Sequence, residues 1–110
     1  MSQRETALQF IKRFCAGDVA GLEPLLCEDL HFRGPWHRSD SRDAYLAVLC
    51  DDPPERCEFR LLSVTQADDS VAVFYEYRKA DGSLTIAQLF HFRDDRISDI
   101  TLVFDGRSSE

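Results

Sequence analysis

The residues best suited to do chemistry lie in the segment HFRGPWHRSD, residues 31–40, which combines two histidines, two arginines and a tryptophan. His37 follows the Gly34–Pro35 break, where a chain leaves regular structure. A histidine can act as a general base near neutral pH, and the alternative is an exposed loop histidine without a chemical role. Trp36 could cover a bound ligand as a lid, or it could anchor the loop in the core. The sequence leaves both pairs of interpretations open.

Three polar side chains on two later segments are the other candidates. Tyr75 and Tyr77 are two residues apart, so they share one face of a strand. Either hydroxyl could polarise a carbonyl or epoxide oxygen, or both rings could simply fill the core. Gln88 interrupts an apolar strand face, and its amide could anchor a ligand carbonyl because a buried amide needs partners. The catalytic candidates are therefore His37 and Tyr75, and Gln88 is the main binding candidate.

Helices and a meander of strands must position these groups. Apolar spacing and cap residues predict helices over residues 4–17, 19–26 and 39–49. Gly17 should end the first helix, Asp18 should cap the second, and Ser39 or Asp40 should cap the third. Strands are expected over residues 28–33, 58–66, 70–79, 83–93 and 96–105. Because short turns join the last four strands, neighbours should pair as antiparallel hairpins, which gives an α+β fold with helices on one sheet face.

The second face of the predicted sheet is also partly apolar. A sheet with one solvent-exposed face should alternate more cleanly than these strands do. The predicted helices cover only one face, so the simplest cover for the other face is a second copy of the chain. The sequence thus predicts a homodimer through Phe74, Leu89, His91 and Val103. His31 is expected to point to this outer side as well.

Composition narrows the function classes. The chain has 110 residues and a formal net charge of −7, which fits one domain over residues 1–110 and argues against nucleic acid as a partner. No apolar run approaches a membrane span and no signal segment is evident, so we expect no membrane partner and a cytoplasmic location. The four cysteines fit no zinc pattern and should be small buried thiols, with a Cys50–Cys57 disulfide as the weaker alternative. No phosphate loop or calcium loop is present, so neither a metal nor a cofactor is expected.

The order and spacing of three motifs carry a family resemblance. FCAGDVAGLEPLL, FRGP and HFRDDRISDI lie in one order along nearly the whole chain. In this respect the sequence resembles the nuclear transport factor 2-like superfamily, and within it the SnoaL-like and ketosteroid-isomerase-like branch. The resemblance implies a curved antiparallel sheet wrapped around three N-terminal helices, with a cone-shaped pocket. It also implies dimers through the convex sheet face. Members of this branch include isomerases, cyclases, dehydratases, epoxide hydrolases and proteins without catalysis.

The resemblance can be tested on the isomerase residues one at a time. Matching on the AGD motif places Phe10 where that branch has a tyrosine donor. Gly34 stands where it has the aspartate base, and Phe90 stands where it has a protonated acid. None of these side chains can supply a base or a hydrogen-bond donor, so ketosteroid isomerase chemistry is not expected.

The pocket implied by the resemblance would be largely apolar. Its expected lining residues are Phe10, Phe14, Trp36, Tyr45, Tyr75, Tyr77, Gln88, Phe90, Leu102 and Phe104. The leading prediction is a domain that binds a small apolar ligand. One alternative is an enzyme of the cyclase, dehydratase or epoxide hydrolase kind that acts on a small apolar substrate. The other is a non-catalytic dimerisation module whose working surface is the convex face of the sheet.

Overall fold

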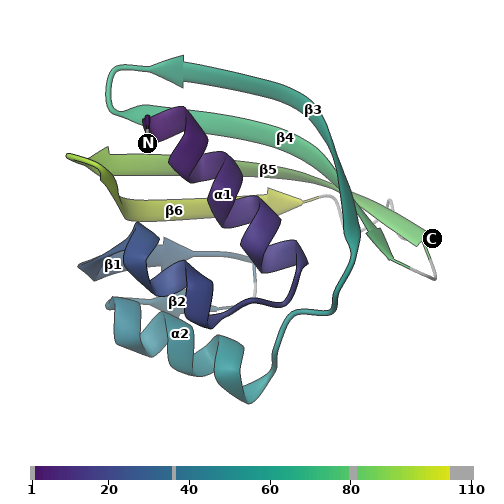
Figure 1. Cartoon of the computed structure of the whole chain (residues 1–110), viewed down its shortest axis with the longest axis horizontal. Helices are drawn as coiled ribbons and strands as arrows, with labels where there is room; N and C mark the ends of the chain where they lie inside the picture. Colours follow the sequence, from purple (N-terminus) through teal and green to yellow (C-terminus); the bar gives the residue numbers. More distant parts are fainter. Residues whose placement is uncertain (1, 36, 80–81, 105–110) are drawn as a thin grey trace.

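The chain folds as a curved sheet with helices on its inner side, as the computed structural model shows (Figure 1). The structure describes residues 2–35, 37–79 and 82–104, and these form two α-helices, one 3₁₀ helix and six strands. The helices are α1 (Gln3–Cys15), η1 (Ala20–Leu25) and α2 (Arg42–Asp51). The strands are β1 (Leu26–Arg33), β2 (Arg38–Ser39), β3 (Glu58–Ala67), β4 (Ser70–Lys79), β5 (Gly82–Arg93) and β6 (Arg96–Phe104). The predicted α+β class is confirmed.

Helix α1 begins with a reciprocal cap. The Ser2 hydroxyl accepts a hydrogen bond from the Glu5 N–H at 3.1 Å, and the Glu5 carboxylate accepts one from the Ser2 N–H at 3.3 Å. The donation from Ser2 lowers the pKa of Glu5. At the other end, Gly17 has a φ of +75°, a conformation that a glycine adopts without strain. The predicted helix end at Gly17 is therefore correct to within two residues.

The prediction of three N-terminal helices is only partly right. The second helix is the short 3₁₀ helix η1, because Pro24 has no N–H to donate within an α-helix. The N-cap residue is Val19, which makes no side-chain cap bond, so the predicted cap at Asp18 is one residue off; the Asp18 carboxylate nevertheless accepts from the Gly21 N–H at 3.0 Å. The third helix, α2, follows the first long strand β1 in the chain, as the sequence predicted, with the short strand β2 between them.

The cap of α2 also differs from the prediction. Its N-cap is Ser41, whose hydroxyl accepts from the Ala44 N–H at 3.0 Å. Ser39 cannot serve, because it lies in β2 and pairs with Phe32 across the β1–β2 hairpin. Asp40 instead lies 3.6 Å from the His31 imidazole. Strand β2 is too short to leave a periodic signal in the sequence, and we did not predict it.

The strand order of the sheet is β2-β1-β6-β5-β4-β3. The four strands β3 to β6 form the antiparallel meander that the sequence predicts. In addition, β1 pairs with β6 in parallel, so the first long strand of the chain lies beside the last one. This pairing brings the loop after β1 against the middle of the sheet.

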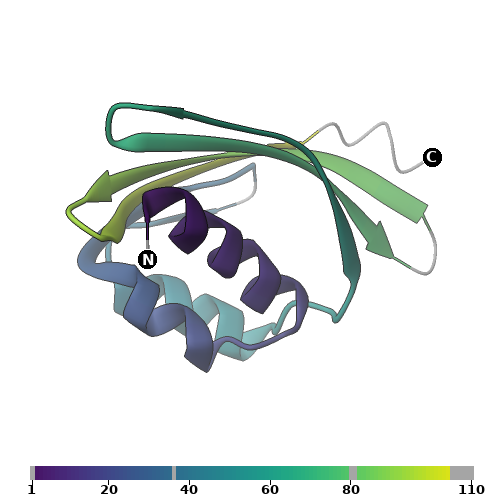
Figure 2. The same cartoon turned by 45° about the horizontal axis from the view of Figure 1, so that its top comes forward.

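The sheet arches over helix α1 (Figure 2). Its register shifts between Leu61 and Ser63 in β3, and between His91 and Phe92 in β5. Such irregularities bend a strand and increase its twist. The concave face of β4 is buried, as predicted, through Val71, Val73, Tyr75 and Tyr77. The predicted outward direction of Phe74, Leu89, His91 and Val103 is confirmed, with Phe74 47% and Val103 57% exposed.

Aromatic side chains fill the space between α1 and the sheet. The Phe10 ring is fully buried and meets the Phe90 ring edge-on, with 5.4 Å between centroids. On its other side Phe10 stacks on Tyr45 of α2, at 6.5 Å. Phe10 therefore joins helix α1, helix α2 and strand β5 into one core. None of the helices in the described ranges has the length and apolar character needed to span a membrane.

Candidate functional site

A small cavity of about 120 Å³ lies between the helices and the concave sheet face. Its lining is Phe14, Phe32, His37, Tyr45, Leu49, Tyr75, Gln88 and Leu102. These residues come from helices α1 and α2, strands β1, β4, β5 and β6, and the β1–β2 loop. None of the eight side chains carries a fixed charge, so the cavity suits an uncharged guest.

The main polar feature of this wall is a buried pair of side chains. The Tyr75 hydroxyl donates to Gln88 Oε1 at 2.9 Å, and both residues are at most 3% exposed. Burial raises the pKa of Tyr75 well above its ordinary value, so the hydroxyl stays protonated and acts as a donor. Because Oε1 is engaged by Tyr75, the Gln88 amide nitrogen is the atom left to donate to a guest molecule.

His37 is the second polar group of the wall. Its ring stacks on Phe32 with 4.9 Å between centroids, and its carbonyl accepts from the Gly34 N–H at 3.0 Å. Its Nε2 atom is buried, and no hydrogen-bond partner for it exists within the described ranges. A buried nitrogen without a partner is costly, because desolvation is not repaid by a hydrogen bond. This atom therefore lacks a hydrogen bond that a buried nitrogen normally makes.

Gly34 shapes this part of the wall. A Cβ atom added at this position would come within 3.0 Å of the Phe32 ring. The missing side chain thus allows the Phe32 ring to lie where it stacks on His37. The residue that replaces the isomerase base in the family resemblance has a packing role here.

Tyr45 closes the inner end of the cavity. Its ring lies 4.7 Å from the Phe32 ring, centroid to centroid, and the residue is only 2% exposed. Burial raises the pKa of the Tyr45 hydroxyl above its ordinary value, which keeps it neutral.

The structure brings most of the predicted site residues together. Those that line the cavity are Phe14, His37, Tyr45, Tyr75, Gln88 and Leu102. Phe10 and Phe90 lie in the core instead, and Tyr77 directs its hydroxyl to the Glu55 carbonyl at 3.2 Å. Phe104 is partly buried against the core but does not line the cavity, and Trp36 falls outside the described residues.

Sequence reasoning missed two lining residues, Phe32 and Leu49. Both carried a usable signal, because Phe32 lies on the apolar face of β1 and Leu49 on the apolar side of α2. What could not be read from the sequence was that the loop after β1 folds His37 back onto Phe32.

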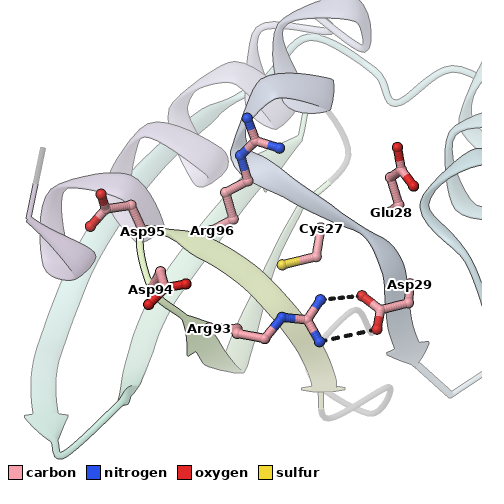
Figure 3. Close-up of a pocket in the computed structure, with 7 residues that line it drawn as sticks. All are labelled: Cys27, Glu28, Asp29, Arg93, Asp94, Asp95 and Arg96. Atoms are coloured by element: carbon pink, nitrogen blue, oxygen red, sulfur yellow. Dashed lines mark hydrogen bonds and ion pairs between the residues drawn. The ribbon is translucent and has the colours of Figure 1, made fainter.

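A larger but open hollow of about 650 Å³ lies at the β5–β6 turn and the start of β1 (Figure 3). It is lined by Cys27, Glu28, Asp29, Arg93, Asp94, Asp95 and Arg96. Both guanidinium ends of Arg93 pair with the Asp29 carboxylate, which lowers the pKa of Asp29, whereas the Arg96 side chain extends away from them. Arg93 and Asp29 are more than half exposed, so this pair is a surface feature and a weaker candidate than the cavity.

A third hollow, of about 220 Å³, surrounds His31 on the outer side of β1. Charges of both signs line it, including Arg33, Arg38 and Asp99. Within the residues described, no group of three or more histidine, cysteine or acidic side chains could hold a metal ion. The apolar cavity between the helices and the sheet is the site with the strongest chemical case.

Solved structures share this fold at low sequence identity. An NTF2-like protein of unknown function from Cytophaga hutchinsonii is 17% identical, covers 97% of this chain and 93% of its own, and has a TM-score of 0.78. An NTF2-like protein of unknown function from Burkholderia xenovorans is 16% identical, with coverage of 94% and 82% and a TM-score of 0.82. A protein with a cystatin-like fold from Silicibacter pomeroyi is 19% identical, with coverage of 96% and 78% and a TM-score of 0.77.

The family itself is established from the sequence. Comparison with curated proteins gives no match. The model of the SnoaL-like domain, however, matches residues 7–100, which is most of the chain. The resemblance noted from the three motifs is therefore confirmed, and the chain belongs to the SnoaL-like domain family with a nuclear transport factor 2-like fold.

Proposed function

We propose that the domain binds one small, uncharged and largely apolar molecule in the cavity between Phe14 and Gln88. The observation that carries the proposal is a partly open apolar cavity with a buried Tyr75–Gln88 pair in its wall. An apolar cavity of about 150 Å³ can hold benzene; this cavity is smaller, about 120 Å³, but it is partly open, so a single ring would bind with one edge toward the opening. In this proposal, the cavity is the counterpart of the cone-shaped pocket that the family resemblance implies.

The polar atoms of the wall define one feature of the ligand. The Gln88 amide nitrogen donates, so the ligand carries a carbonyl or hydroxyl oxygen that accepts. A hydroxyl would also supply a donor for the unpartnered His37 Nε2. Cyclohexanone and phenol meet these requirements, benzene lacks the oxygen, and benzoate adds a charge that the wall cannot neutralise.

The test is a binding measurement with these four probes on two matched variants. Gln88→Leu removes the amide inside the cavity, and Gln66→Leu makes the same change at an exposed position on β3. We expect cyclohexanone and phenol to raise the melting temperature of the wild type. Gln88→Leu should weaken their binding about tenfold, the value of one hydrogen bond, whereas Gln66→Leu should leave it unchanged. If no neutral probe binds, or if Gln88→Leu binds cyclohexanone as tightly as the wild type, the proposal is wrong.

A second candidate function is an enzyme on the same cavity, and the unpartnered His37 Nε2 favours it. His37 would remove a proton from water, and the water oxygen would attack an epoxide carbon as the C–O bond breaks. The Gln88 amide would stabilise the alkoxide that results, and the protonated His37 would return the proton to it to give the diol. Cyclohexene oxide has a suitable size. His37→Gln should abolish its conversion to the diol, and His31→Gln on the outer face should not. The enzyme proposal fails if the wild type does not convert the epoxide or if His37→Gln converts it equally well.

The convex face supports a further proposal, a homodimer. Phe74, Ala87 and Val103 stand in register across β4, β5 and β6, and Leu89 follows one step along β5. A contiguous exposed apolar row of this kind is typical of a protein interface. We expect a dimer by sedimentation at micromolar concentration and a monomer for Val103→Lys, with Thr65→Lys at the β3 edge of this face as the control. If the wild type is a monomer, the dimer proposal is wrong and the apolar row is an ordinary exposed surface.

A further inference from the structure

Two cysteines that are far apart in the sequence meet in the fold. Cys15 is the last residue of α1, and Cys57 stands directly before β3. The Cys57 N–H donates to the Cys15 carbonyl at 2.9 Å. Residues joined by such a bond have Cα atoms on the order of 5 Å apart, as in a paired strand. That separation lies within the range that a disulfide spans without backbone movement.

The segment before Cys57 holds this arrangement in place. A Cβ atom at Gly17 would lie 3.5 Å from the Pro54 carbonyl oxygen and 3.6 Å from Arg56 Cγ. The loop from α2 to β3 therefore packs against the end of helix α1. The Tyr77 hydroxyl, which donates to the Glu55 carbonyl at 3.2 Å, fixes the same loop from the sheet side.

The two side chains also interact. Cys57 is close enough to the Cys15 thiol and the Tyr77 hydroxyl that, next to burial, it contributes to the raised pKa of both groups. Cys57 is partly exposed, whereas Cys15 is 2% exposed. A reagent from solvent can thus reach Cys57 first, and Cys15 lies directly behind it.

We propose that Cys15 and Cys57 form a reversible dithiol–disulfide pair that a small-molecule disulfide such as oxidised glutathione can close. The Cys57 thiolate attacks one sulfur of the reagent, the reagent's S–S bond breaks, and one thiolate leaves. Cys15 then loses its proton to solvent and attacks the Cys57 sulfur, which releases the second thiolate. The protein gives up two electrons and two protons, and the reagent becomes two thiols.

The order of these steps follows from the environment of each thiol. Burial, together with the nearby Cys57, raises the pKa of the Cys15 thiol, so Cys15 is a poor first nucleophile. Within the protein the attack of Cys15 is intramolecular, and proximity compensates for low acidity. In the reducing cytoplasm that we propose as the location, the pair would be the dithiol found in this structure.

The expected consequence of closure is a more stable chain. The bond would close a loop of about 40 residues between α1 and β3, and cross-links of this length lower the entropy of the unfolded state. For a domain of this size we expect a rise in melting temperature on the order of 10 °C.

The experiment treats the folded full-length chain with oxidised glutathione and maps the products by mass spectrometry without reduction. We expect the wild type to lose two hydrogens and to give one cross-linked peptide that contains Cys15 and Cys57. Cys15→Ala should keep glutathione on Cys57, because the second thiol is missing. Cys27→Ala and Cys50→Ala should form the cross-link as the wild type does, and dithiothreitol should reverse it.

Two results would overturn the proposal. One is a Cys50–Cys57 cross-link, the pairing that the sequence offered as an alternative. The other is a wild type that carries glutathione on Cys57 without closing. Should Cys15→Ala fail to fold, Cys57→Ala at the more exposed position gives the same information, because it must abolish the cross-link and the rise in melting temperature.

Discussion

At the residue scale, the Tyr75–Gln88 hydrogen bond depends on strand register. Tyr75 pairs with Ile86 and Gln88 pairs with Val73, so the two polar residues are diagonal neighbours across β4 and β5. Such neighbours are roughly 7–8 Å apart at the backbone, a distance that a tyrosine side chain can bridge. The alternation of each strand predicted that both residues face inward. The contact between them required the register of the hairpin, which alternation alone does not give.

Removing both partners of the Tyr75–Gln88 hydrogen bond should destabilise the domain less than the sum of removing each partner alone. Tyr75→Phe leaves the Gln88 carbonyl oxygen buried without its donor, which costs about 1–3 kcal/mol in the free energy of unfolding. In Tyr75→Phe/Gln88→Leu neither polar group remains, so the double variant should be less unstable than the sum of the single variants. Urea unfolding of the four proteins measures this coupling. Additive effects would mean that the hydrogen bond is not formed in solution.

His37 shows where sequence reasoning at this scale ends. It follows the Gly34–Pro35 break and lines the cavity. Its stacking on Phe32 depends on the short β1–β2 hairpin and on the missing side chain at Gly34. Neither feature has a periodic pattern, so the spacing of residue types could not reveal the contact.

At the element scale, the sequence predicted the strands that local patterns define, but it did not predict which distant strands pair. The boundaries of β4 match the prediction and β5 begins one residue earlier than predicted, because alternation and short turns fix them locally. The predicted end of β6 at residue 105 lies outside the described residues. Strands β1 and β6 pair over a long sequence separation, and no local pattern encodes their parallel contact. The helix α2 began later than predicted because Ser39 was needed in β2.

The cap of helix α1 gives a prediction at this scale. Ser2→Ala removes the hydroxyl that accepts from the Glu5 N–H, and the loss of such a cap costs about 1 kcal/mol. Ser63→Ala on exposed β3 is the matched control and should change stability by less than about 0.5 kcal/mol. Urea unfolding at neutral pH compares the two. Equal effects would show that the cap contributes nothing to α1 in the intact domain.

At the scale of the whole molecule, the three tyrosines make stability depend on alkaline pH. Tyr45, Tyr75 and Tyr77 are all buried, and burial raises the pKa of each hydroxyl in the folded state. In the unfolded chain they ionise at about pH 10, so above that pH the unfolded state releases protons that the folded state keeps. Their contribution is complete below pH 10 and is lost as the pH rises through the folded-state values.

This linkage predicts a steep loss of stability above pH 10. Each tyrosine that stays neutral only in the folded state should lower the free energy of unfolding by about 1.4 kcal/mol per pH unit. Tyr45→Phe should make the decline shallower by one such contribution. Urea unfolding at a series of pH values, with tyrosine ionisation followed by ultraviolet absorbance, measures both. A free energy of unfolding that stays constant across this range would contradict the burial of the three hydroxyls.

The parallel contact between β1 and β6 has a consequence for synthesis on the ribosome. The chain emerges from its N-terminus, so α1, η1 and β1 leave the exit tunnel long before β6 exists. During that interval the β6-facing edge of β1, with its backbone donors and acceptors, has no strand to pair with. During the same interval the apolar face of α1 has no concave sheet to pack against. The nascent domain therefore cannot complete its sheet until β6 has been synthesised, and until then this edge of β1 stays open to pairing with other strands.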